Sequence, residues 1–120
     1  MDILVVDDSR IMRTILQRAI RQAGYRGLDV GEAGNAMEAM EKLRTEKPKL
    51  ILSDWNMPEK SGLDFLKEIR AAENGTPFGF VTSEASVEMR SLALSSGAAF
   101  MLSKPFTPDD IHDAIAPILD

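Results

Sequence analysis

Short blocks of consecutive apolar residues alternate along the chain with longer stretches of helical spacing. Four blocks are clear and a fifth is weaker: residues 3–6, 50–52, 78–81 and 100–102, with the weaker block at 28–30. Apolar runs without polar alternation are typical of strands whose two faces are both buried, as in parallel sheets. The pattern therefore predicts five parallel strands.

The first helical stretch has the strongest amphipathic pattern. Gly24 follows it and is expected to end the helix at the C′ position. Its apolar residues fall on one stripe, which we expect to face inward: Ile11, Met12, Ile15, Leu16, Ala19, Ile20 and Ala23.

The second helical stretch is expected to start at Asn35, a residue that favours the N-cap position. Glu38 and Lys42 are spaced four apart, which predicts an ion pair on the helix surface. Three apolar residues are expected to point inward: Met37, Met40 and Leu43.

Two further helices are expected over residues 62–71 and 86–96, and a last one from residue 107 onward. The first should bury Leu63, Leu66 and Ile69, and Gly97 should stop the second. Thr107 as N-cap, followed by Pro108, opens the last helix. We expect Pro117 to end or kink it.

The element order is strand–helix, repeated five times. Because crossovers between parallel strands are right-handed, this order predicts an α/β fold with helices on both faces of an open sheet. Five strands favour a doubly wound, flavodoxin-like sheet with strand order 2-1-3-4-5. No linker or repeat interrupts the pattern, so residues 1–120 are expected to form one domain.

Polar residues gather where the predicted strands end. Asp7 and Asp8 follow the first strand, Asp54 the third, Thr82 closes the fourth, and Lys104 follows the fifth. Ligands of such sheets bind beyond the carboxyl ends of the strands, at the point where the strand order reverses. We therefore expect these five residues to share one site.

Three carboxylates in one cleft repel one another unless a cation is present. Mg²⁺ prefers oxygen ligands and binds through one or two carboxylates, which makes it the expected cofactor. Lys104 supplies a mobile positive charge and Thr82 a hydroxyl. The set fits phosphoryl transfer in which one carboxylate becomes an aspartyl phosphate.

Each of these residues also has a simpler interpretation on its own. Asp7, Asp8 or the following Ser9 can cap the first helix, and Thr82 and Lys104 can be ordinary surface residues. The joint placement at four strand ends is what favours a common site.

Composition excludes several other classes of protein. The chain has no cysteine and one histidine, which rules out disulfides, Cys-based zinc sites, thiol nucleophiles and multi-His metal centres. With 14 Lys and Arg against 19 Asp and Glu, the acidic balance argues against nucleic acid as a partner. No apolar run is long enough for a membrane helix, and residues 1–3 do not resemble a signal peptide. We expect a cytoplasmic monomer.

Several motifs carry a family resemblance. They are Val5-Val6-Asp7-Asp8-Ser9, Ser53-Asp54-Trp55-Asn56-Met57-Pro58, Val81-Thr82-Ser83-Glu84-Ala85 and Lys104-Pro105-Phe106. With these motifs at these spacings, the whole chain resembles the receiver domains of bacterial two-component response regulators, those of chemotaxis above all. The resemblance implies a phosphorylation-activated switch that accepts a phosphoryl group from a histidine kinase or phosphotransfer protein. It also implies that the chain catalyses only its own phosphorylation and dephosphorylation.

The resemblance implies a role for each matching residue. Asp54 is the expected phosphoacceptor. The implied Mg²⁺ ligands are Asp8, Asp54 and the backbone carbonyl of Asn56, with Asp7 acting through water. Lys104, preceding a cis peptide bond to Pro105, pairs with Asp54 and then with its phosphate.

The implied switch residues lie in the second half of the chain. Thr82 would move inward to bind a phosphoryl oxygen, and Asn56 and Glu84 would tune hydrolysis. Met101 stands where family members often carry Tyr or Phe, and the neighbouring Phe100 should point to the opposite face. Coupling through Met101 would depend on packing alone.

The expected partners follow from charge and resemblance. Five arginines and no acid lie between residues 10 and 26, which indicates either a solvated face or a docking surface for an acidic kinase. The sequence does not specify the output partner, and a flagellar motor switch is one possibility.

The sequence leaves two alternative functions open. One is a phosphate-sink receiver, and the other is a small Mg²⁺-dependent aspartyl-phosphate phosphatase, although the two acids of such enzymes usually lie two residues apart and here they are adjacent.

Overall fold

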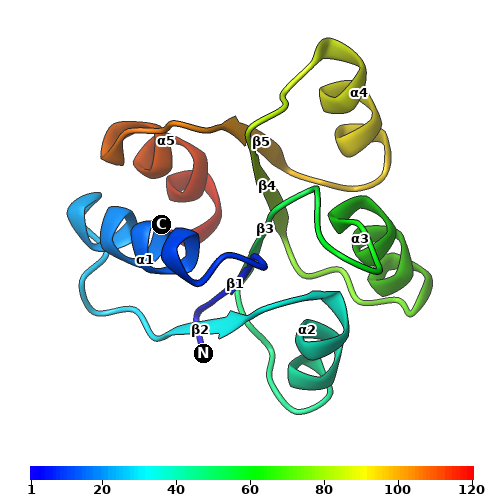
Figure 1. Ribbon diagram of the computed structural model, residues 1–120. Helices are drawn as coiled ribbons and strands as arrows, with labels where there is room; N and C mark the ends of the chain where they lie inside the picture. Colours follow the sequence, from blue (N-terminus) through cyan, green and yellow to red (C-terminus); the bar gives the residue numbers. More distant parts are fainter.

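The computed structural model describes residues 1–120 and alternates strands with helices throughout (Figure 1). The strands are β1 (Ile3–Val6), β2 (Val30–Ala33), β3 (Leu50–Ser53), β4 (Phe78–Thr82) and β5 (Phe100–Ser103). The helices are α1 (Arg10–Gln22), α2 (Ala36–Leu43), α3 (Gly62–Ala71), α4 (Val87–Ser95) and α5 (Pro108–Leu119). The strands pair in parallel in the order β2-β1-β3-β4-β5, which confirms the predicted flavodoxin-like topology.

The sheet is covered on both faces, with α1 and α5 on one side and α2, α3 and α4 on the other (Figure 1). Side chains alternate along β1: Ile3 and Val5 pack in the cluster that contains α1 and α5 residues, whereas Leu4 and Val6 pack with α2 and α3. Burial on both faces explains why the central strands are continuous apolar runs.

Every helix begins at a capping side chain that accepts a backbone N–H bond, as predicted for Asn35 and Thr107. Ser9, not Asp7 or Asp8, caps α1, with its Oγ accepting from the Met12 amide at 3.2 Å. Gly24 and Gly97 both have φ of +106°, a conformation that favours glycine, and they follow α1 and α4 as expected. The capping question at residues 7–9 is thereby decided, and the carboxylates of Asp7 and Asp8 are not needed for the cap.

The weaker apolar block was placed too early. The second strand is β2 at Val30–Ala33, not residues 28–30. Gly31 and Glu32 interrupt its apolar character because β2 is an edge strand, where only one neighbour pairs with the backbone.

The amphipathic stripes of α1 and α2 were predicted too wide. Ile11 is 74% exposed, Ile15 42% and Met37 63%, whereas Leu16, Ala19 and Ile20 form the buried face of α1. A helix packed on a sheet buries only the side chains directed at it, and the flanks of the apolar stripe remain in solvent.

One further local prediction was wrong, as was one of the two effects expected of Pro117. Glu38 and Lys42 form no ion pair; instead Arg44 Nη1 lies 3.4 Å from Glu41 Oε2. Pro117 does not end α5, which continues to Leu119. Proline has no backbone N–H, so the carbonyl of Asp113, one helical turn earlier, lacks its usual donor. Asp113 is exposed, so water can donate to that carbonyl instead.

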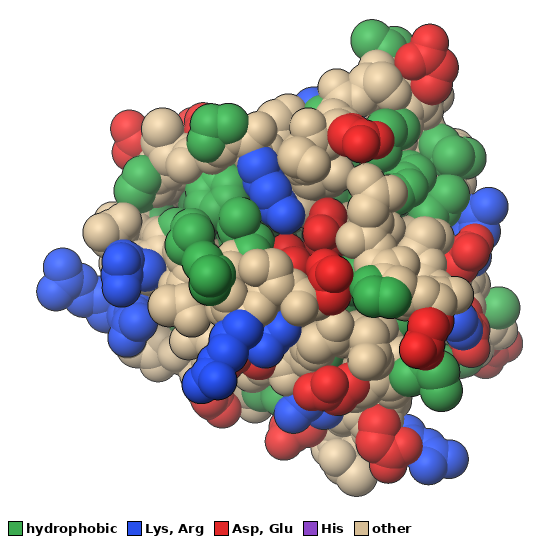
Figure 2. Space-filling view, in the orientation of Figure 1, with side chains coloured by type: hydrophobic (Ala, Val, Ile, Leu, Met, Phe, Trp, Pro, Cys, Tyr) green, Lys and Arg blue, Asp and Glu red, His purple; other side chains and the backbone are tan.

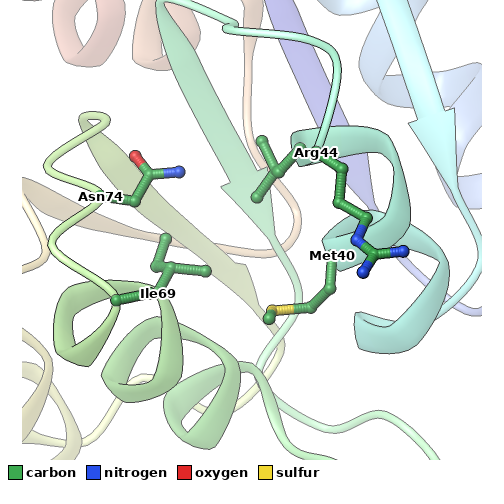
Figure 3. A pocket seen from close by; sticks show the side chains of 6 residues that line it. Met40, Arg44, Ile69 and Asn74 are labelled. Carbon is green, nitrogen blue, oxygen red and sulfur yellow. The ribbon is translucent and has the colours of Figure 1, made fainter.

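A shallow cavity of about 250 Å³ lies between α2 and α3 (Figure 3). Its lining includes Arg44, next after α2, and Asn74, in the loop after α3, so it opens at the end of the molecule opposite to the carboxyl ends of the strands. Its wall is mainly apolar, from Met40, Leu43 and Ile69. None of the helices is long and apolar enough to cross a bilayer.

Candidate functional site

Three carboxylates meet at the carboxyl ends of the two central strands. Val6 of β1 and Ser53 of β3 are register partners, so the residues after them, Asp7 and Asp54, leave the sheet side by side. Asp8 follows in the same turn. Asp7, Asp8 and Asp54 each offer an oxygen, and these atoms lie within 4.8 Å of one another. The structure therefore brings together the acids that the sequence placed in one site.

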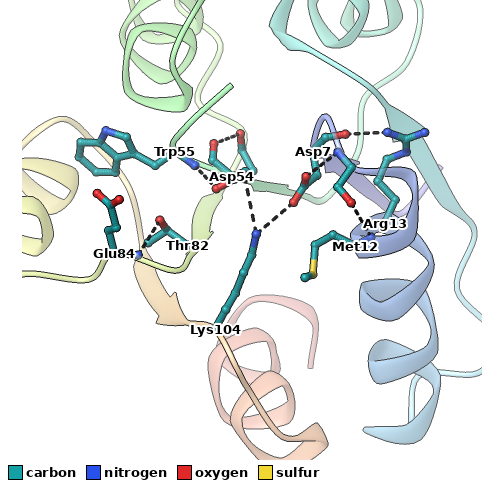
Figure 4. Close-up of polar contacts among 10 residues, drawn as sticks. Asp7, Met12, Arg13, Asp54, Trp55, Thr82, Glu84 and Lys104 are labelled. Carbon is teal, nitrogen blue, oxygen red and sulfur yellow. Dashed lines mark hydrogen bonds and ion pairs between the residues drawn. The ribbon is translucent and has the colours of Figure 1, made fainter. Parts of the chain in front are cut away.

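Lys104 reaches this cluster from β5 (Figure 4). Its backbone N–H donates to the carbonyl of Thr82 at 2.8 Å, which holds the end of β5 against β4. Its Nζ lies 3.3 Å from Asp7 Oδ2 and 3.6 Å from Asp54 Oδ2. The peptide bond between Lys104 and Pro105 is cis, as expected. One ammonium thus bridges two carboxylates from different strands.

The three acids differ in environment. The side chain of Asp7 is 2% exposed and that of Asp54 12%, while Asp8 is exposed. Burial raises the pKa of Asp54 above its ordinary value, and the charge of Asp7 adds to this effect. The ammonium of Lys104 and the backbone amides of Trp55 and Asn56 lower the pKa and so oppose the shift.

Backbone amides also fix the orientation of the two buried carboxylates. The Trp55 amide donates to Asp54 Oδ1 at 2.7 Å, and the Ser9 amide donates to Asp7 Oδ1 at 2.9 Å. The second oxygen of each carboxylate faces Lys104. Asp8 makes no hydrogen bond or ion pair through its side chain, so its position depends on the backbone of the turn.

Thr82 lies at the edge of this site but points its hydroxyl elsewhere. Its side chain is fully buried, and its Oγ1 accepts a hydrogen bond from the Glu84 amide at 3.2 Å (Figure 4). Asn56 and Glu84 are exposed on the loops that follow β3 and β4. Neither Thr82 nor Glu84 is bonded to the three carboxylates.

Met101 and Phe100 lie on opposite faces of β5, as the strand period predicts. Met101 is 3% exposed and belongs to the core cluster beneath α2, α3 and α4. Phe100 packs against the cluster on the α1 and α5 side. Its ring lies over Gly79, in the space that a side chain at residue 79 would occupy. Met101 is therefore already packed inside the protein.

The donor set fits a hard divalent cation. All of its side-chain donors are carboxylate oxygens, which suit Mg²⁺ better than softer metals. Three acids face one ammonium, so negative charge remains uncompensated, and exposed Asp8 leaves the cluster open to solvent. Figure 2 shows acidic side chains gathered in the middle of this face, with a basic side chain beside them.

Two residues near the site make contacts that the sequence did not predict. Arg13, counted there only as part of a basic helix, turns inward: its Nη1 donates to the carbonyl of Asp7 at 2.7 Å and its Nε to Glu32 Oε1 at 2.9 Å. Gly62 packs so closely on the carbonyl of Asp54 that no Cβ would fit. Nothing in the sequence pairs residue 13 with residue 32, whereas a glycine opening a helix is a weak signal of close packing.

The sequence matches the response regulator receiver domain family over residues 3–116. The chain belongs to this family. The chemotaxis protein CheY1 of Helicobacter pylori is 38% identical, covering 99% of this chain and 97% of its own. The CheY homolog of Campylobacter jejuni is 36% identical, covering 99% and 92%.

Solved receiver structures share the fold. The chemotaxis protein CheY4 of Vibrio cholerae superposes with a TM-score of 0.87 at 31% identity, over 98% of both chains. The receiver domain of the Francisella response regulator 1452 gives 0.83 at 28% identity, over 98% of this chain and 94% of its own. The chain is a CheY-like receiver domain, a class of two-component signalling switches rather than of classical enzymes.

Proposed function

We propose that this receiver domain, residues 1–120, is a phosphorylation-activated switch whose phosphoacceptor is Asp54. The observation that supports this is the pairing of Asp54 Oδ2 with Lys104 Nζ at 3.6 Å inside an acidic cluster. A histidine kinase or phosphotransfer protein supplies the phosphoryl group from a phosphohistidine, and the receiver itself catalyses the transfer.

Asp54 is better placed to react than the other two acids. Asp7 is 2% exposed, with one oxygen on the Ser9 amide at 2.9 Å and the other on Lys104. Asp8 is exposed, and its side chain has no hydrogen-bond or ion-pair partner. In the transfer, a carboxylate oxygen of Asp54 bonds to phosphorus as the phosphorus–nitrogen bond breaks, and the imidazole keeps that electron pair. Lys104 offsets negative charge beside the reacting atoms.

Mg²⁺ is the proposed cofactor. The residues that would hold it are Asp8, Asp54 and the backbone carbonyl of Asn56, with Asp7 acting through water. When bound, the ion neutralises charge on the phosphoryl oxygens. The chain's own residues orient the acceptor: the Trp55 amide fixes Asp54 Oδ1, and Lys104 faces Oδ2.

The proposed switch runs from Thr82 to β5. The Thr82 hydroxyl exchanges its bond to the Glu84 amide for one to a phosphoryl oxygen, which changes the loop before α4. Met101, packed under that region, transmits the change by packing alone. Asn56 and Glu84 flank the acceptor and tune the access of water to the acyl phosphate.

The proposed kinase-docking surface is the outer face of α1. Arg10, Arg18, Arg21 and Arg26 are exposed there or just beyond its end, together with the apolar side chains of Ile11 and Ile15. Such a face fits an acidic, partly apolar partner. The output surface comprises α4, β5 and α5, and the CheY relatives favour a chemotaxis output in the cytoplasm, with a flagellar motor switch as one candidate partner.

Labelling by acetyl phosphate tests the proposal. With Mg²⁺ present, intact mass spectrometry of the wild type should detect one phosphoryl adduct that Asp54→Asn lacks. Asp64→Asn, which changes an exposed acid on α3, is the matched control and should label as the wild type does. Undiminished labelling of Asp54→Asn would remove Asp54 from the proposed role, and turnover of a small phosphate ester would favour a phosphatase instead.

A further inference from the structure

The side chain of Arg13 ties together three segments that are separate in the sequence. From α1, its Nη1 donates to the backbone carbonyl of Asp7 at the end of β1, at 2.7 Å. Its Nε donates to Glu32 on the edge strand β2, at 2.9 Å. The side chain is 17% exposed, so it is an inward-turned member of the basic helix (Figure 4).

The carbonyl that Arg13 holds belongs to the peptide that joins Asp7 to Asp8. Asp7 is fixed on its other side by its own amide, which donates to the carbonyl of Ala33 at 3.1 Å, and by the Ser9 amide on its carboxylate. The side chain of Asp8 makes no hydrogen bond or ion pair of its own. The direction in which the Asp8 side chain leaves the turn depends in part on the orientation of this peptide, and Arg13 Nη1 is the side-chain group that donates to its carbonyl.

Glu32 determines how Arg13 acts. Its carboxylate lies on Nε and offsets the guanidinium charge, so Arg13 holds the turn by hydrogen bonds without adding free positive charge beside a cation site. The two bonds come from two nitrogens of one planar group. Lysine, a point charge on a flexible stem, cannot reproduce this fork.

We infer that Arg13, oriented by Glu32, is a positioning residue that sets the Asp7–Asp8 peptide and with it the affinity of the acidic cluster for a divalent cation. The inference rests on the proposed function, because it concerns the same carboxylates. It adds two residues, one of them on the edge strand, that touch neither the phosphoryl group nor the cation.

Calorimetric titration with Mg²⁺ alone tests this role without any phosphotransfer. Arg13→Gln should bind Mg²⁺ about tenfold more weakly than the wild type, the scale on which partners that orient metal ligands act. Arg13→Lys keeps the charge but loses the fork, and should be weakened to a similar degree. Arg44→Gln removes the same charge from an exposed, distant arginine and should leave the affinity unchanged.

Glu32→Gln separates positioning from general stability. It removes the charge that offsets Arg13 while leaving the α1 core contacts in place, so it should weaken Mg²⁺ binding without lowering the melting temperature beyond that of Arg44→Gln. Because Glu32 acts through Arg13, the double variant Arg13→Gln/Glu32→Gln should bind no more weakly than Arg13→Gln alone. Amide exchange at Ser9 should be faster in both single variants.

The outcomes distinguish this role from the proposed function. If the wild type binds Mg²⁺ and labels at Asp54, but Arg13→Gln and Glu32→Gln bind as tightly as Arg44→Gln, the positioning role is overturned and the switch stands. If the variants lose affinity additively, Glu32 does not act through Arg13 and the inference also fails. If the wild type neither binds Mg²⁺ nor labels, both proposals fall together.

Discussion

Lys104 Nζ lies 3.6 Å from Asp54 Oδ2 and, at the same time, 3.3 Å from Asp7 Oδ2. The lysine side chain is 17% exposed, and both carboxylates are more buried than that. A cation held between two poorly solvated anions relieves their mutual repulsion, so the folded receiver depends on Lys104 whenever no divalent ion is bound.

Replacing Lys104 by Met should therefore destabilise the metal-free protein by about 1–2 kcal/mol, because two carboxylates lose their shared cation. Mg²⁺ offsets the same charge, so it should raise the melting temperature of Lys104→Met more than that of the wild type. Thermal unfolding with and without Mg²⁺ measures both effects. Lys49→Met, which breaks a more exposed pair with Asp2, is the control and should change stability little. Equal stability of Lys104→Met and the wild type in chelator would contradict this account.

Asp54→Asn should stabilise the metal-free receiver near neutral pH. Burial raises the folded-state pKa of Asp54 above 3.8, so the folded protein binds this proton more tightly than the unfolded chain does. The sign of the linkage follows: the contribution of Asp54 to stability is greatest at low pH and is lost as the pH rises through the raised pKa. The asparagine side chain that replaces Asp54 carries no charge at any pH.

In chelator, the melting temperature of Asp54→Asn should therefore exceed that of the wild type by about 2–5 °C, and this difference should shrink toward pH 3.8. A difference that grows on acidification has the opposite sign and would exclude burial as the dominant cause.

Thr82→Val tests the switch separately from the chemistry. Valine matches threonine in shape but leaves the Glu84 amide without its 3.2 Å acceptor, which should cost about 1 kcal/mol of stability. Labelling of Asp54 should persist. The amide chemical-shift changes that beryllofluoride produces in β5 should shrink, because no hydroxyl is available to follow the phosphoryl group.

Thr82→Ser keeps the hydroxyl and is the matched control. It should preserve the beryllofluoride response of β5 even though it leaves a small cavity in the core. If valine and serine variants respond alike, the hydroxyl does not carry the signal.

The central strands could be predicted from the sequence because they are buried on both faces. Leu50, Ile51 and Leu52 form a continuous apolar run for that reason, whereas the edge strand β2 contains Gly31 and Glu32 and was misplaced. The acids were predicted to meet because parallel strands end at one edge, a consequence of topology alone.

Features that depend on side-chain packing could not be predicted. The inward turn of Arg13 requires Glu32 on a neighbouring strand, and the exposure of Ile11 depends on how much of α1 the sheet and α5 cover. Periodicity predicts which residues share a helix face, but it does not measure how much of that face is buried.

Charge reversal on α1 tests the proposed kinase-docking face. Arg18→Glu/Arg21→Glu should slow phosphoryl transfer from the cognate kinase at least tenfold, by removing electrostatic attraction, and should leave labelling by acetyl phosphate unchanged. Arg13 is unsuitable for this test because its guanidinium already pairs with Glu32 at 2.9 Å. Lys67→Glu reverses one exposed charge on α3 and controls for a charge reversal made away from α1. Equal slowing with both donors would point to damage at the acidic cluster instead of lost docking.

Gly62→Ala should disturb the phosphoacceptor from outside the acidic cluster. A Cβ at residue 62 would overlap the backbone carbonyl of Asp54 and press on the ring of Phe80, and the Gly62 amide is itself bonded to the Trp55 carbonyl at 2.8 Å. The peptide after Asp54 must shift to make room, which moves both the carboxylate and the loop bearing Asn56. We expect about 2 kcal/mol of destabilisation, typical of overpacking, together with weaker Mg²⁺ binding and slower labelling by acetyl phosphate.

Gly75→Ala is the matched control, since a Cβ there meets nothing within 4 Å, and it should leave all three quantities unchanged. A Gly62→Ala variant that is destabilised but labels at the wild-type rate would show that Asp54 keeps its geometry when the carbonyl behind it moves.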